Sequence, residues 1–189
     1  MSPFEYVIVL VSIIMGLGIT LVLSGIAQLI REEKSVKVFW PYLIWIGLVF
    51  VLHIHEWWIT YQLKSMVAWK LPTFLFIILY PILLFILAKL LFPDSWDKNN
   101  RDMRQFYFSI SRKFFGCAIA LVVLSVLQNV FISELPITTQ FIHVIILLII
   151  SRMLMMRPTS VLPHVVVAVL LLTILVVSLI IERNSLLIQ

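Results

Sequence analysis

Long runs of apolar residues alternate with short polar segments along the chain, and this pattern predicts the secondary structure. Six apolar stretches each approach the roughly 20 residues that a helix needs to cross about 30 Å of hydrocarbon. The predicted fold class is an all-α, polytopic helical membrane protein, with six transmembrane helices in a single domain over residues 1–189. We expect the spans at residues 3–30, 38–61, 71–92, 114–132, 135–156 and 161–181.

The composition agrees with a membrane protein. The chain has 189 residues, of which 62% are hydrophobic and 12% are charged, and a soluble core of this size could not bury so many apolar side chains. The formal charge is +5, but the basic residues lie mostly in short segments beside the apolar stretches, where membrane topology explains them. We therefore expect a lipid bilayer and no nucleic acid as partner. The single Cys117 allows neither an intramolecular disulfide nor a cysteine metal cluster.

Small and polar residues recur along the first predicted helix. Ser12, Gly16, Thr20 and Ser24 are four residues apart, and this spacing lets another helix approach closely, as in small-xxx-small packing. We expect the ridge to serve helix packing and the first helix to be central in the bundle.

Residues 93–113 form the long polar segment of the chain. Aromatic and apolar residues fall there near helical spacing, with basic residues among them, a pattern typical of a helix that lies on a membrane surface. We expect an amphipathic cytoplasmic loop in which Arg101, Arg104, Arg112 and Lys113 bind anionic lipid or a cytoplasmic partner. His164, at the start of the last span, is expected at the membrane interface.

The distribution of basic residues predicts the orientation of the helices. Eleven of the 14 Lys and Arg residues lie in or beside the first, third and fifth connecting segments. Cytoplasmic loops carry this excess in membrane proteins. We therefore expect both termini outside, in a bacterial inner membrane or its equivalent.

The stretch HIHEWW at residues 53–58 brings ionisable groups into apolar sequence. His53 lies about seven residues before the end of the second span and His143 about seven after the start of the fifth, so both lie roughly 10 Å below the same surface. His53 and Glu56 share a helix face, whereas His55 points about 200° away from His53. We expect His55 to face another seam, a neighbouring subunit or the headgroups.

These depths predict an outward-facing polar pocket, because ionisable groups inside a membrane usually line a cavity or pair with one another. Ser125 reaches a similar depth to the histidines, while Gln128 and Gln140 are shallower. The expected pocket residues are His53, Glu56, His143, Gln128, Gln140 and Ser125.

Several chemistries fit these residues, and they remain alternatives. His53, Glu56 and His143 offer three ligands for zinc or another borderline metal ion. His53 and His143 also suit a bis-His haem between two helices. The metalloprotease pattern H-E-x-x-H fails, because Ile59 occupies the second histidine position. No phosphate-binding loop, nucleophile elbow or dinucleotide fingerprint is present, so a soluble-type enzyme is not expected.

The sequence thus leads to three functional hypotheses. The first is a small membrane protein that forms a channel or transporter-like pathway for protons, metal cations or a small solute. We expect it to be a homo-oligomer, because a single six-helix chain leaves little room for a pore. The alternative is a non-catalytic membrane subunit or signalling partner that acts through the basic segment 93–113. The third is a bis-His haem redox protein.

Overall fold

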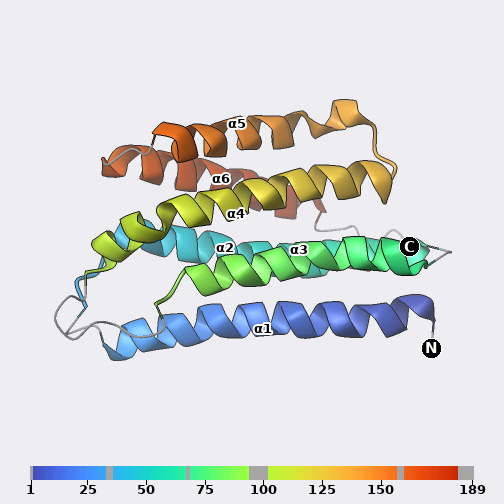
Figure 1. Cartoon of the computed structure of the whole chain (residues 1–189), viewed down its shortest axis with the longest axis horizontal. Helices are drawn as coiled ribbons and strands as arrows, with labels where there is room; N and C mark the ends of the chain where they lie inside the picture. The colour runs from blue at the N-terminus through green and yellow to red at the C-terminus, as the bar shows by residue number, and fades with distance from the viewer. Residues whose placement is uncertain (1, 33–35, 67–68, 94–101, 157–159, 183–189) are drawn as a thin grey trace.

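The structure is a bundle of helices that run along one common axis (Figure 1). The computed structural model describes residues 2–32, 36–66, 69–93, 102–156 and 160–182. The long helices are α1 (Pro3–Arg31), α2 (Trp40–Thr60), α3 (Leu71–Leu90), α4 (Met103–Phe131), α5 (Phe141–Met156) and α6 (Val161–Glu182), with short 3₁₀ helices η1 (Tyr61–Ser65) and η2 (Ile137–Gln140). Six helical segments in these ranges are long and apolar enough to cross a membrane.

Local sequence explains where several helices begin. Prolines in the first turns of α1, α2 and α3 occupy positions whose N–H groups have no helical partner. At the start of α1, the Ser2 N–H donates to the Glu5 carboxylate at 2.7 Å and the Glu5 N–H donates to Ser2 Oγ at 3.2 Å. This reciprocal capping box satisfies two N-terminal donors.

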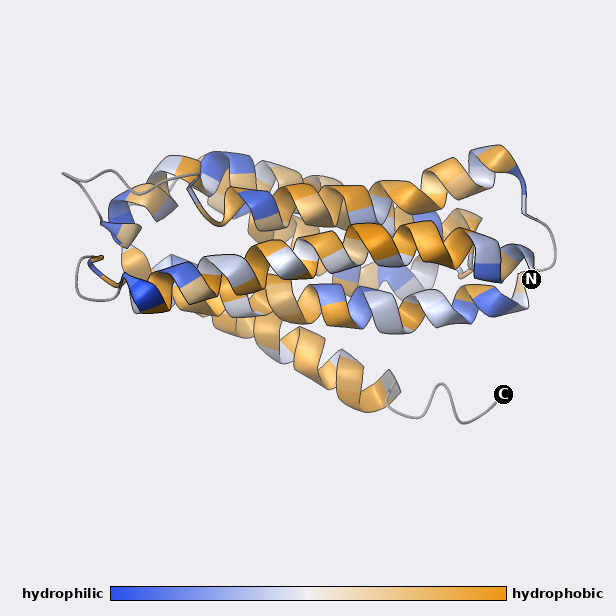
Figure 2. Cartoon of the chain, turned by 90° about the horizontal axis from the view of Figure 1, so that it is seen from below, coloured by the Kyte–Doolittle hydropathy of each residue, from blue (hydrophilic) through white to orange (hydrophobic). Residues whose placement is uncertain are grey.

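Consecutive helices alternate in direction, so the start of α1 and the end of α6 lie at the same end of the bundle (Figure 1). We call this the terminal end and the opposite one the basic end. α1 packs on α2 and α3, α3 on α4, α4 on α5, and α6 mainly on α2. Figure 2 shows the apolar last turns of α6 diverging from the other helices toward the terminal end.

Helix α4 is longer than the sequence pattern predicts. It begins at Met103 rather than at residue 114, and Asp102 caps it by accepting hydrogen bonds from the backbone N–H groups of Arg104 and Gln105. Residues 103–113 are therefore the first turns of α4 and not a separate helix on the bundle surface. Arg104, Arg112 and Lys113 are exposed on this part of α4, whereas Arg101 lies outside the described residues.

An aromatic cluster at the basic end explains this extension. Tyr107 of α4 is buried, and its ring centroid lies 5.0 Å from that of Tyr42 in α2, with the two rings tilted by 45°. Its hydroxyl shares a hydrogen bond of 2.6 Å with Nδ1 of His164 in α6. His164 is only 2% exposed, so its side chain packs within this cluster and does not face the surroundings of the bundle. The first turns of α4 thus hold α2 and α6 together.

Helix α1 packs through a different face from the predicted ridge. Gly16, Thr20 and Ser24 are exposed and Ser12 is half-buried, so the ridge makes little contact within the chain. The buried face instead consists of Val7, Val11, Met15, Gly18, Val22 and Gly25. These residues follow the three- and four-residue spacing of a helix stripe. A ridge with a strict spacing of four drifts around the helix, because a turn holds 3.6 residues.

Candidate functional site

A cavity of about 430 Å³ lies between five of the helices, α2 to α6. Its size and its mostly apolar lining are those of ordinary small-molecule sites in proteins. The α2 residues that line it extend from Trp45 to Ile59, which corresponds to roughly 21 Å along the helix axis. The cavity is therefore elongated along the bundle and forms within one chain.

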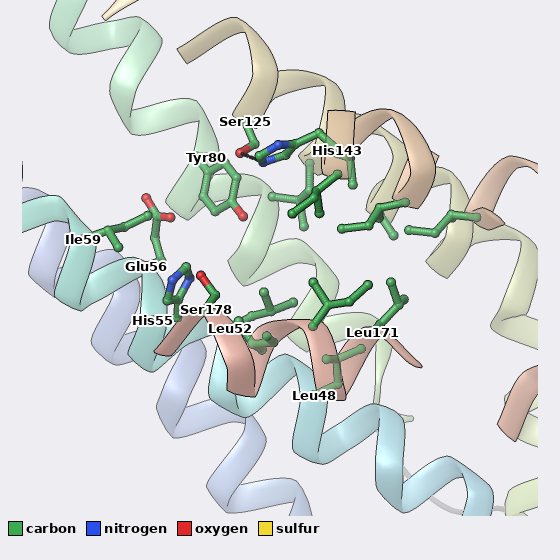
Figure 3. Close-up of a pocket in the computed structure, with 18 of the residues that line it drawn as sticks. Leu48, Leu52, His55, Glu56, Ile59, Tyr80, Ser125, His143, Leu171 and Ser178 are labelled. Atoms are coloured by element: carbon green, nitrogen blue, oxygen red, sulfur yellow. Dashed lines mark hydrogen bonds between the residues drawn. The ribbon is translucent and has the colours of Figure 1, made fainter. Parts of the chain in front are cut away.

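The polar groups of the cavity gather toward the terminal end (Figure 3). They come from every helix that lines it, and the η helices contribute as well. The polar lining residues are His55, Glu56, Gln62, Tyr80, Ser125, Asn129, Thr139, His143 and Ser178. Toward the basic end the lining is apolar and includes Leu48, Leu87, Phe114, Ile150 and Leu171.

Helix α2 presents one continuous face to the cavity. Leu48, Leu52, His55, Glu56 and Ile59 all line it and recur every three or four residues, so their side chains lie on one side of the helix. In Figure 3, His55 and Glu56 both border the space at its polar end. The site therefore contains His55, which sequence reasoning had assigned to a different surface.

His53 lies outside the cavity, contrary to the prediction. Its side chain is 0% exposed, and its Nδ1 hydrogen-bonds the carbonyl oxygen of Val49 at 2.8 Å. A Cβ atom at Gly18 of α1 would lie 2.3 Å from Nε2 of His53, so the imidazole fills the space that this glycine leaves open. His53 packs α2 against α1, and it does not share a pocket with Glu56.

His143 and Ser125 meet at the cavity wall, as their depths predicted. Nε2 of His143 and Oγ of Ser125 are 3.2 Å apart in a hydrogen bond between α5 and α4. Nδ1 of His143 is buried and has no hydrogen-bond partner among the described residues.

Gln128 supports α3 rather than the cavity. Its Nε2 donates to the carbonyl oxygens of Phe76 at 2.8 Å and Ile77 at 3.2 Å. Pro81 lies inside α3 and lacks the N–H that would ordinarily bond the carbonyl of Ile77. Gln128 thus satisfies backbone acceptors next to the proline and joins α4 to α3.

Gln140 belongs to the connection between α4 and α5. It is 2% exposed, accepts a hydrogen bond of 3.0 Å from Asn129, and donates one of 3.0 Å to Thr139 Oγ1. Glu134 at the turn has a positive φ of 54°. Gln140 does not line the cavity, but it fixes Asn129 and Thr139, which do.

Glu56 is the one acidic or basic residue, apart from histidines, among the described residues that line the cavity. Its side chain is half-buried, and no described side chain donates a hydrogen bond to its carboxylate. Thr60 bonds only its backbone oxygen, at 2.6 Å. The ring of Tyr80 lies beside Glu56, and its hydroxyl points into the cavity (Figure 3). The carboxylate is therefore available to a ligand.

The positions of His53, Glu56 and His143 do not form the metal or haem site that the sequence suggested. Among the described residues, no group of three or more His, Cys, Asp or Glu side chains could hold a metal ion. His53 lies in the interface between α1 and α2, whereas His143 lies across the cavity on α5. The two imidazoles therefore cannot ligate one haem iron in this arrangement.

Several site residues were missed from the sequence, namely His55, Tyr80, Asn129, Thr139 and Ser178. The stripe of Leu48, Leu52, His55 and Ile59 carried a usable signal, because apolar residues at helical spacing mark the face that packs inward. Tyr80 and Ser178 carried no such signal, since each is an isolated polar residue in an apolar helix.

Comparison with protein families, curated proteins and solved structures gives no match for this chain.

Proposed function

We propose that this chain is a polytopic membrane protein that binds a lipid-like amphiphile in the cavity enclosed by helices α2 to α6. The carrying observation is the division of this cavity into a polar terminal end and an apolar remainder. An amphiphile has the matching division, with a polar headgroup and an apolar chain. The headgroup of the ligand would lie near Glu56 and His143, and its apolar chain would extend toward Phe114.

We propose a direction of the bundle in the membrane from the distribution of its basic residues. Most of the described basic residues, among them Arg31, Lys89 and Arg104, lie at the basic end, while Lys64 and Lys70 lie at the terminal end. By the positive-inside rule, this excess favours a cytoplasmic position for the basic end. The polar end of the cavity and both chain termini would then face outward, in a bacterial inner membrane or its equivalent. The exposed Arg104, Arg112 and Lys113 would face anionic headgroups of the cytoplasmic leaflet.

The lining favours a binding site over an open ion pathway. An ion pathway needs polar groups or water along its length, whereas Leu48, Leu87 and Phe114 line the cavity toward the basic end. If the protein transports its ligand, helices must move to open that end. The sequence hypothesis named protons, metal cations or a small solute, and the amphiphile proposed here replaces them as the ligand.

The divergence of α6 suggests how the ligand enters. Its last turns separate from the other helices at the terminal end (Figure 2), where Leu175 and Ser178 line the cavity. A lipid-like molecule could pass beside α6 from the outer leaflet without crossing water. The apolar chain would lose little on leaving the bilayer, because both environments are apolar.

Photolabelling in lipid nanodiscs tests this proposal. We suggest three probes that share one long saturated chain with a diazirine near its end and carry an amine, an alcohol or a phosphate monoester. The expected result is labelling of peptides around Leu48 and Phe114 by at least one probe, competed by the unlabelled compound. Absence of competed labelling there with all three probes would overturn the proposal.

A matched pair of variants on α4 separates the cavity from the lipid-facing surface. Ala118 lines the cavity, and Ala120, two residues away, is exposed. Ala118→Trp should abolish cavity labelling because the indole fills the space, whereas Ala120→Trp should retain it. Size-exclusion elution and circular dichroism of both variants show whether the bundle remains folded. Equal labelling of two folded variants would also contradict the proposal.

A further inference from the structure

The polar end of the cavity contains one acidic side chain and, among the described residues, no lysine or arginine. The acidic side chain is that of Glu56, and the rest of the described lining holds no lysine or arginine either. We infer that the ligand headgroup is a protonated amine, so that the ligand is a long-chain cationic amphiphile. This inference rests on the proposed function and names the chemical class of its ligand.

The position of Glu56 explains the preference for a cation. The carboxylate is half-buried on α2, within a membrane-spanning helix, and receives no hydrogen bond from a described side chain. Such a group is costly inside a membrane unless it is paired. An ammonium group would pair with it through a charge-assisted hydrogen bond, which is among the stronger hydrogen bonds in proteins.

Neighbouring groups complete a site for an ammonium headgroup. Tyr80 lies beside Glu56 and presents an aromatic ring and a hydroxyl oxygen to the same space (Figure 3). A cation near such a ring gains further electrostatic attraction. Ser125, Asn129 and Thr139 also line the cavity and add oxygen acceptors to this polar end.

Other headgroups fit this end of the cavity less well. A phosphate would meet the like charge of Glu56 without a lysine or arginine to offset it, and phosphate sites usually contain such residues. An alcohol could bond the hydroxyl groups, but it would leave the carboxylate without a countercharge. The apolar chain of the ligand moves between two apolar environments, the bilayer and the cavity. The headgroup therefore determines which amphiphile the cavity prefers.

The same three probes test this inference by their relative affinities. We expect the amine to bind about tenfold to a hundredfold more tightly than the alcohol, as one charge-assisted hydrogen bond implies. The phosphate should bind most weakly.

Variants of Glu56 identify the cause of the preference. Glu56→Gln should remove most of the advantage of the amine and leave the affinity of the alcohol nearly unchanged, whereas Glu56→Asp should retain part of the advantage. Glu134→Gln is the matched control, because Glu134 is exposed at the same end of the bundle and does not line the cavity.

The outcomes distinguish this inference from the proposed function. Cavity labelling by the alcohol or phosphate with an affinity equal to that of the amine would overturn the amine inference and leave the proposed function standing. An amine advantage that persists in folded Glu56→Gln would also overturn it. Absence of cavity labelling by all three probes would overturn both.

Discussion

The contact between Gln128 and α3 allows a quantitative test of the helix packing. The Gln128 Nε2 donates to the carbonyl oxygens of Phe76 and Ile77 at 2.8 and 3.2 Å. Gln128→Leu preserves the approximate volume and removes both hydrogen bonds. The carbonyl of Ile77 would then lack a donor, because Pro81 has no N–H.

The expected cost follows from measured hydrogen bonds between membrane helices. Such bonds average about 0.6 kcal/mol and reach about 1.7 kcal/mol each. Two bonds to backbone acceptors therefore predict that Gln128→Leu lowers the free energy of unfolding by about 1–3 kcal/mol. The effect should be clear, because a typical protein is stable by only about 5–15 kcal/mol.

A double-mutant cycle isolates the role of the proline. In Pro81→Ala, the new N–H at residue 81 can bond the carbonyl of Ile77 in the ordinary helical pattern. In this background, Gln128→Leu should lower the free energy of unfolding by about half as much as in the natural protein. Only the loss of the hydrogen bond to Phe76 would then leave an acceptor without a replacement donor. The coupling free energy between the two positions is the difference between these costs.

Unfolding by sodium dodecyl sulfate in mixed micelles, followed by circular dichroism, measures the four free energies. Leu127→Ala is a suitable control, since Leu127 neighbours Gln128 on α4 and is 38% exposed. An equal cost of Gln128→Leu in the natural and the Pro81→Ala backgrounds would refute the reasoning. The glutamine would then not act by satisfying the acceptor beside the proline.

Two further predictions concern packing and use the same unfolding measurement. Gly18→Ala should lower the free energy of unfolding by about 1–3 kcal/mol through overpacking, because the new Cβ would lie 2.3 Å from Nε2 of His53. Gly16→Ala is the control and should be neutral or stabilising, because no atom lies within 4 Å of its Cβ position. Equal effects of the two variants would contradict the packing of α1 on α2. Tyr107→Phe should cost about 1 kcal/mol through loss of its hydrogen bond to His164, and unchanged stability would show that this bond contributes nothing to the bundle.

The apolar pattern was sufficient to predict the six helices, since each needs a long apolar stretch whatever its neighbours are. The start of α4 was not predictable in the same way. Basic residues such as Arg104 and Lys113 gave residues 103–113 the appearance of a surface segment. Its buried face depends on Tyr42 and His164, which are distant in sequence and become neighbours only in the folded bundle.

The candidate site was predicted in part. Matching depths correctly brought His143 to Ser125, because depth along a helix follows from residue count. Rotation about the helix axis is harder to predict, since it depends on which neighbour each face meets. His53 has a glycine opposite it in α1, and nothing local in the sequence of α2 indicates this partner.

The two histidines of α2 thus have different roles: His53 packs α2 against α1, and His55 lines the cavity. His53 fills a space that a glycine leaves in α1, and the interface between α1 and α2 closes around it. This packing fixes the rotation of α2 and directs His55 and Glu56 toward α6 and the cavity. The arrangement of the candidate site therefore depends on a contact on the opposite side of α2. Loss of that contact can disturb the site without any change to a residue that lines it.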